Sequence, residues 1–94
     1  MGNQKHDVEF SKMEYHALLN NLMISSMFEE YLRTPKKKSG EYITISMSES
    51  IIDSLAGFVA AEANHAKSEE EEEILGSAYE SIESTLYSIK RICR

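Results

Sequence analysis

Residues 42–66 read YITISMSESIIDSLAGFVAAEANHA, and they contain both kinds of element expected in this chain. In residues 42–46, β-branched side chains alternate with polar ones, which predicts a strand. From about residue 48 to 66, apolar side chains spread over a wide arc of the helical wheel, which predicts a helix buried on more than one side. The stretch therefore indicates an α+β fold in which a strand leads directly into a buried helix.

The segment before this stretch predicts another strand and a long helix. Residues 8–10 alternate apolar and polar side chains, as a short strand does. Ser11 and Glu14 have the spacing of a capping box, so we expect a helix over about 12–33. A loop over 34–40 follows, because its proline, lysines and glycine interrupt the helical pattern.

The segment after it predicts a third helix, over about 69–92. Ser68 and Glu71 form a second candidate capping box, and the apolar residues that follow share one arc of the wheel. The expected order is therefore strand, helix, loop, strand, helix, helix. With 94 residues the chain is long enough for one core. We expect a mainly α, α+β domain over 8–94 with three amphipathic helices and one or two short strands, after a flexible tail over 1–7.

The helix expected over 12–33 carries two apolar stripes that point in nearly opposite directions. Either this helix bends near residues 20–26, or it packs against two different surfaces. Because three helices offer little protein to cover both stripes, we expect a second subunit to cover the later one. This predicts an intertwined or helix-packed homodimer, or a higher oligomer. The expected interface residues are Ile24, Met27, Phe28, Tyr31 and Leu32.

Charge and composition exclude several classes of partner and compartment. Sixteen acidic and ten basic residues give a net charge of −6, which disfavours nucleic acid and anionic membranes as partners. No apolar run is long enough to span a membrane. A single cysteine, Cys93, cannot form an internal disulfide, and the N-terminus lacks the apolar stretch of a signal peptide. We therefore expect a cytoplasmic protein.

The five glutamates of Glu69–Glu73 allow two interpretations. Acidic residues in a first helical turn complement the helix dipole, and basic residues follow at the other end of the same helix. Alternatively, the run is a docking surface for a basic protein, of the immunity or inhibitor type. Binding of that kind weakens steeply with salt.

The strand and helix of residues 43–66 resemble the start of ribbon-helix-helix repressors, which dimerise through the strand. The resemblance implies that outward strand residues read DNA. In that family the next helix N-terminus approaches a phosphate, but here it carries Glu69–Glu73, which would repel one. For the same reason we expect the basic cluster of Arg33 and Lys36–Lys38 to be a solvated loop rather than a contact with nucleic acid. A strand-swapped dimer that does not bind DNA is compatible with this charge, whereas a repressor is not, and we expect no nucleic-acid partner.

A Glu-x-x-His sequence, Glu62 to His65, places a carboxylate and an imidazole on one helix face. It resembles the metal-binding element of ferritin-like di-iron proteins. The resemblance implies further glutamates from neighbouring helices, which Glu29 or Glu30 and a second subunit would supply. The plainer alternative places His65 at the exposed end of its helix, where it interacts favourably with the dipole. Glu62 and His65 are thus the candidate metal ligands.

No pattern in the chain points to catalysis. The sequence has no glycine-rich phosphate loop, and Cys93 lies next to the C-terminus, far from any histidine in the sequence. We therefore expect no enzymatic activity and no cofactor. The leading hypothesis is a small protein–protein interaction or regulatory module that self-associates, with a further protein partner left open. The alternatives are an acidic binder of a basic protein and an oligomeric metal-binding protein.

Overall fold

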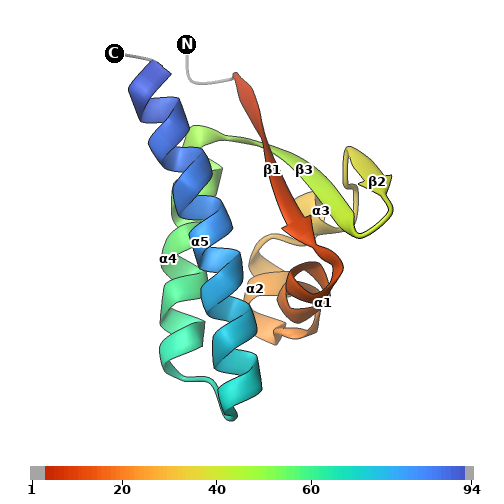
Figure 1. The fold of residues 1–94 in the computed structure, drawn as a ribbon, viewed down its shortest axis with the longest axis vertical. Coiled ribbons are helices and arrows are strands. Elements are labelled where there is room, and N and C mark those ends of the chain that lie inside the picture. The colour runs from red at the N-terminus through yellow and green to blue at the C-terminus, as the bar shows by residue number, and fades with distance from the viewer. Residues whose placement is uncertain (1–3, 93–94) are drawn as a thin grey trace.

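The computed structural model describes residues 4–92 and has an α+β fold that is mainly helical (Figure 1). This confirms the expected fold class. The chain runs through β1 (Lys5–Ser11), α1 (Lys12–Asn20), α2 (Leu22–Met27), α3 (Glu29–Leu32), β2 (Lys37–Ser39), β3 (Tyr42–Ser48), α4 (Glu49–Asn64) and α5 (Glu69–Ile92). Within residues 4–92, no helix combines the length and the hydropathy needed to cross a bilayer.

The three strands form one antiparallel sheet in the order β1-β3-β2. Val8 lies opposite Ile45 and Phe10 opposite Ile43, so the apolar residues of β1 and β3 share one face. The other face is polar. Since side chains alternate along a strand, this register buries every second residue and leaves the rest at the surface.

The sheet extends further than the sequence pattern predicted. Lys5–Asp7, expected in a flexible tail, pair with Ser46–Ser48, and residues 1–3 of that tail lie outside the described part of the chain. Lys37–Ser39, expected in a loop, form β2. A two-residue turn joins β2 to β3, and Gly40 at its first position has a φ of 58°. Only glycine adopts that angle at no steric cost, which fits a type II′ hairpin.

The helices α4 and α5 pack side by side along the longest axis of the molecule, and α1, α2 and α3 lie beside this pair (Figure 1). Residues from all of these helices and from the sheet meet in one core. Its largest fully buried side chains are Phe10, Leu18, Ile24, Leu32, Ile45, Met47, Ile52, Leu55, Leu75, Ile82, Val8 and Val59.

The helix expected over 12–33 is three helices, and this change removes the need for a second subunit at the later stripe. Asn21, in an extended conformation, separates α1 from α2, and Phe28 separates α2 from α3. The two breaks rotate the chain so that Tyr15 and Leu18 of the first stripe and Ile24, Phe28 and Leu32 of the later one all turn inward. Tyr15 on α1 then donates a hydrogen bond from its hydroxyl to the carbonyl oxygen of Leu32, 2.5 Å away on α3.

Most of the expected interface residues are covered by this same chain. Ile24, Phe28 and Leu32 are buried, and Tyr31 is half-buried. The Phe28 ring meets Phe58 of α4 edge-on, with 5.6 Å between ring centroids. Among the five, Met27 alone is exposed. In this fold Ile24, Phe28 and Leu32 thus pack within their own chain rather than at its surface.

Candidate functional site

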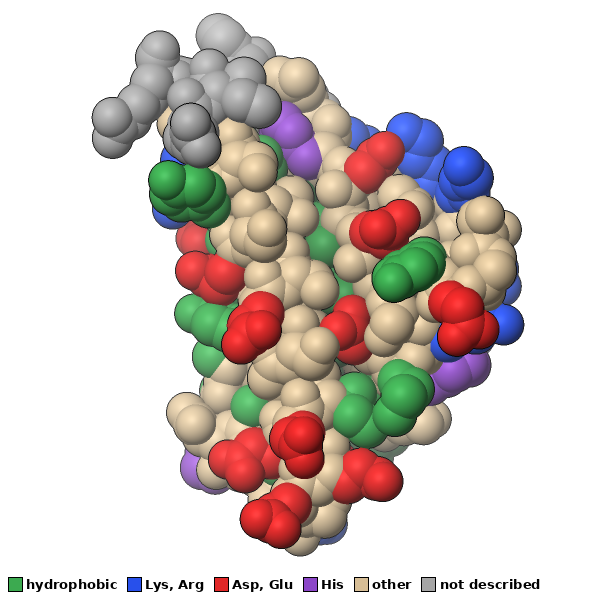
Figure 2. Space-filling view, viewed as in Figure 1, with side chains coloured by type: hydrophobic (Ala, Val, Ile, Leu, Met, Phe, Trp, Pro, Cys, Tyr) green, Lys and Arg blue, Asp and Glu red, His purple; other side chains and the backbone are tan. Residues whose placement is uncertain are grey.

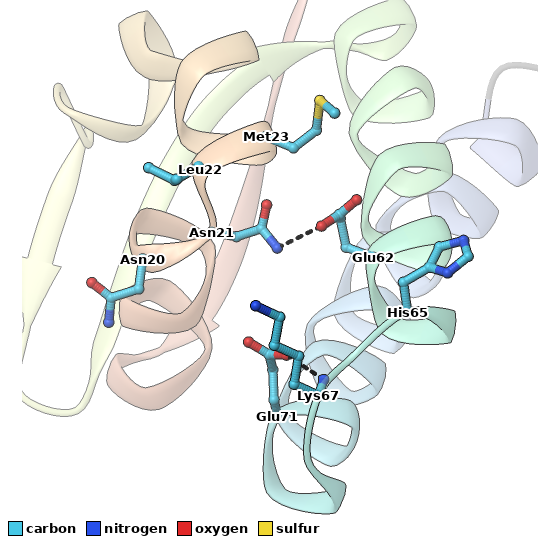
Figure 3. Close-up of a pocket in the computed structure, with 8 residues that line it drawn as sticks. All are labelled: Asn20, Asn21, Leu22, Met23, Glu62, His65, Lys67 and Glu71. Carbon is cyan, nitrogen blue, oxygen red and sulfur yellow. Dashed lines mark hydrogen bonds between the residues drawn. The ribbon is translucent and has the colours of Figure 1, made fainter.

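An open hollow of about 580 Å3 lies where the α1–α2 junction faces the α4–α5 turn (Figure 3). The α1–α2 side contributes Asn20, Asn21, Leu22 and Met23. The other side contributes Glu62, His65, Lys67 and Glu71. Two of these eight side chains are large and apolar, and both belong to α2. One side of the hollow is thus partly apolar, and the other side carries both acidic and basic side chains.

Asn21 holds the two sides of the hollow together. Its side-chain oxygen accepts a hydrogen bond from the Ile24 backbone N–H at 3.0 Å, which caps α2. Its amide nitrogen donates to Glu62 Oε1 at 2.9 Å, as the dashed line in Figure 3 shows. Asparagine is a favoured helix N-cap because its short side chain reaches the free N–H groups of the first turn. One residue therefore both starts α2 and ties it to α4.

The two candidate metal ligands line this hollow, but the structure does not assemble a metal site around them. The Glu62 carboxylate accepts the hydrogen bond from Asn21, and His65 is exposed at the end of α4. Glu29, a possible further ligand, is paired with Arg33 at 3.0 Å on α3. Within residues 4–92, no three His, Cys, Asp or Glu side chains are grouped closely enough to hold a metal ion. Within one chain, Glu62 and His65 are therefore the two candidate ligands that line the hollow, and the further ligands that the resemblance implies would have to come from a second subunit.

The face of α2 that looks away from the core is apolar. Its exposed residues are Leu22, Met23, Ser26 and Met27. Leu22 is 85% exposed, and Met23 and Met27 are about half exposed. Only Ser26 among the four is polar. We call Leu22, Met23 and Met27 the α2 patch.

Acidic side chains cover a second part of the surface. Glu69–Glu73 are all exposed, and Figure 2 shows acidic side chains gathered at the end of the molecule where α5 begins. The Ser68 hydroxyl accepts a hydrogen bond from the Glu71 N–H at 3.1 Å and caps α5. The Glu71 carboxylate accepts another from the Lys67 N–H at 3.0 Å, just before the helix. Among the side chains of residues 4–90, the ion pairs join Arg33 to Glu29 and Lys36 to Asp7, so neither of them involves the glutamates at the start of α5.

A continuous helix over 12–33 would place Leu22 and Met23 on a buried stripe, but the structure places them at the surface. The wheel of a continuous helix assigns them to the side of Leu18, which is buried. The available signal was the Asn20-Asn21 pair, because asparagine favours helix caps over helix interiors. A helix that ends at this pair restarts with a new rotation, and the residues just after the break no longer follow the first stripe.

Comparison of the chain with protein-family models, with curated proteins and with solved structures found no match. Function is therefore inferred from the surface of the molecule itself.

Proposed function

We propose that the chain is a non-enzymatic protein–protein interaction module that makes contact through the α2 patch. One observation carries the proposal: the exposed face of α2 consists mainly of large apolar side chains, with Leu22 85% exposed. A core that already buries residues from every helix and from two strands leaves these side chains in water. Exposed apolar groups that lie together mark contact surfaces more often than isolated ones do.

The chemistry of the α2 patch suits a protein partner. Burying one leucine or methionine side chain contributes about 1.5–3 kcal/mol, so a few such side chains support a reversible contact. Methionine is unbranched and flexible, and surfaces rich in it adapt to the shape of a partner. The helix α2 carries no charged residue, so a partner can cover it without stripping water from an ion.

Site-specific photo-cross-linking tests this proposal. A photoreactive amino acid at Met23, in cells of the protein's own source, should give a discrete adduct. Met13 supplies a matched control, since it is also an exposed methionine at the second position of a helix with an asparagine or serine cap. An adduct from Met23 and none from Met13 supports the proposal. Equal adducts from both positions, or none from Met23, would contradict it.

The acidic surface supports a second candidate function, binding of a basic protein. Glu69–Glu73 are exposed, and the two ion pairs found among the side chains of residues 4–90 do not involve them, so they can attract lysine and arginine side chains. Complementary charge of this kind raises association rates and is screened by salt. In this case the partner would meet the start of α5 rather than α2.

A triple variant tests the second candidate without removing the cap of α5. Glu70→Gln, Glu72→Gln and Glu73→Gln together lower the local charge, while Glu71 keeps its hydrogen bond to the Lys67 backbone. Binding of a lysine-rich peptide should weaken about tenfold in the variant and should weaken in the wild type as salt is added. Equal binding by variant and wild type would reject this function.

A further inference from the structure

We propose that the free edge of β1 pairs with β1 of a second copy of the chain, around a two-fold axis at Asp7, so that the two sheets join into one. The inference goes beyond the proposed function, because it assigns a different surface, between β1 and α5, and names its occupant. Three observations carry it: an open strand edge, a groove that leaves room beside the edge, and a charge pattern that matches its own rotated copy.

The free edge of β1 presents backbone groups that no other strand covers. Within residues 4–92, β1 pairs with β3 alone, whereas β3, the strand of the ribbon-helix-helix resemblance, is paired on both sides. The Lys12 N–H donates to the Glu41 carbonyl oxygen at 2.9 Å, where the β1–β3 ladder continues. Backbone groups alternate between the two edges of a strand, so those of Lys5, Asp7 and Glu9 point away from β3. Such an edge is a template for another strand.

A groove runs between this edge and α5. Two open hollows of about 550 and 450 Å3 lie along β1, and Asp7 and Thr85 line both of them, so the two are continuous. Figure 1 shows α5 beside β1, and Figure 2 shows polar side chains along α5 on this face. The helix therefore flanks the edge without closing it. Most α5 residues that line the groove have small hydroxyl side chains, which leave space for a strand: Ser77, Ser81, Ser84, Thr85 and Ser88.

Charge selects the register of the pairing. In an antiparallel pair, residues whose backbone groups point outward must face each other, which allows only certain positions of the two-fold axis. An axis at Asp7 places Lys5 of each copy opposite Glu9 of the other. The two Asp7 side chains then meet near the axis, but each is paired within its own chain to Lys36 Nζ at 3.0 Å. An axis at Val8 would instead place Asp7 opposite Glu9 twice, which is destabilising because like charges lie directly opposite.

The same pattern favours a second copy over an unrelated peptide. On one side of Asp7 the groove is lined by Lys5 and Lys36, and on the other side by Glu9 and Glu80. A two-fold rotation reverses the groove, so the basic end of one copy meets the acidic end of the other and the two Glu80 side chains stay apart. A uniformly acidic or uniformly basic peptide would match only half of the groove.

Sedimentation velocity from about 10 µM to about 1 mM tests the inference with a charge swap. The wild type should shift from monomer to dimer across the series. Lys5→Glu alone, and Glu9→Lys alone, should each raise the dissociation constant about tenfold, because two attractive cross-strand pairs become repulsive. The double variant restores opposite charges and should return to within about threefold of the wild type. Lys38→Glu, an exposed charge reversal on β2, is the matched control and should dimerise as the wild type does.

Amide chemical shifts along the same dilution series locate the contact. The shifts of Asp7 and Glu9 should change as their N–H groups gain partners, and those of Lys38 should stay constant. A wild type that remains monomeric up to about 1 mM overturns the inference. So does a double variant no tighter than the single ones, or a dimer that leaves the shifts of β1 unchanged. These variants leave α2 untouched, so the cross-linking test at Met23 decides the proposed function separately.

Discussion

Glu14 shows how a single residue ties distant parts of this small chain together. It is the buried charged residue of the described core, 8% exposed. Its Oε1 accepts the Ser11 N–H at 2.9 Å and completes the capping box of α1 that the sequence predicted. Its Oε2 accepts a hydrogen bond from the Ser77 hydroxyl of α5. The sequence predicts the first contact, which is local, but not the second, which spans 63 positions.

Glu14→Ala should lower the free energy of unfolding by about 2–4 kcal/mol, because two hydrogen bonds to a carboxylate are lost. Ser77→Ala should cost about 1–2 kcal/mol, because one of them is lost while the Ser11 contact remains. The double variant should show a coupling of about 1–2 kcal/mol between the two sites. Urea denaturation of the four proteins measures these values. Additive effects would show that Ser77 and Glu14 do not interact.

At the scale of elements, alternation and capping residues predicted the helices and strands better than the helical wheel did. Alternating side chains predict β3, capping residues predict the starts of α1 and α5, and a wide apolar arc predicts α4. None of these signals predicts that three separate helices replace the one expected over 12–33. A wheel assumes an unbroken helix, and the two breaks at Asn21 and Phe28 each reset the rotation. The prediction of a surplus apolar stripe came from that assumption.

Asn21→Ala tests the importance of the first break. The variant loses the cap of α2 and the hydrogen bond to Glu62, and we expect a loss of about 1–2 kcal/mol of stability. Asn20→Ala changes the neighbouring exposed position and should stay within about 0.5 kcal/mol of the wild type. Thermal or urea denaturation of both variants gives the comparison. Equal losses at the two positions would show that Asn21 has no special role.

Replacing glycine by alanine should lower the stability of the fold in the β2–β3 turn and raise it in α4. Gly40→Ala should destabilise the fold by about 1 kcal/mol, because alanine is strained at a φ of 58° although open space surrounds the position. Gly57→Ala, in the middle of α4, should stabilise it by about 0.5–1 kcal/mol, because no atom obstructs the added methyl group and alanine favours the helix. Chemical denaturation measures both. A stabilising Gly40→Ala would exclude the assigned turn.

At the scale of the whole molecule, the structure locates two surfaces whose positions the sequence could not predict. The acidic start of α5 and the apolar face of α2 belong to different elements but adjoin at the hollow, which Leu22, Met23 and Glu71 all line. Composition predicts the net charge but not its distribution. The candidate contact surface depends on a helix break and on the α4–α5 turn, which brings Lys67 and Glu71 to the hollow. Neither is visible in the periodicity of a single helix.

The central claim is that the chain buries the later apolar stripe itself, except for Met27, and exposes the α2 patch. Methyl NMR with a soluble paramagnetic probe tests it most directly. In dilute samples the probe should broaden the methyl signals of Leu22, Met23 and Met27 and leave those of Ile24 and Leu32 sharp. Broadening of Ile24 and Leu32, or protection of Leu22 in dilute samples, would contradict the account.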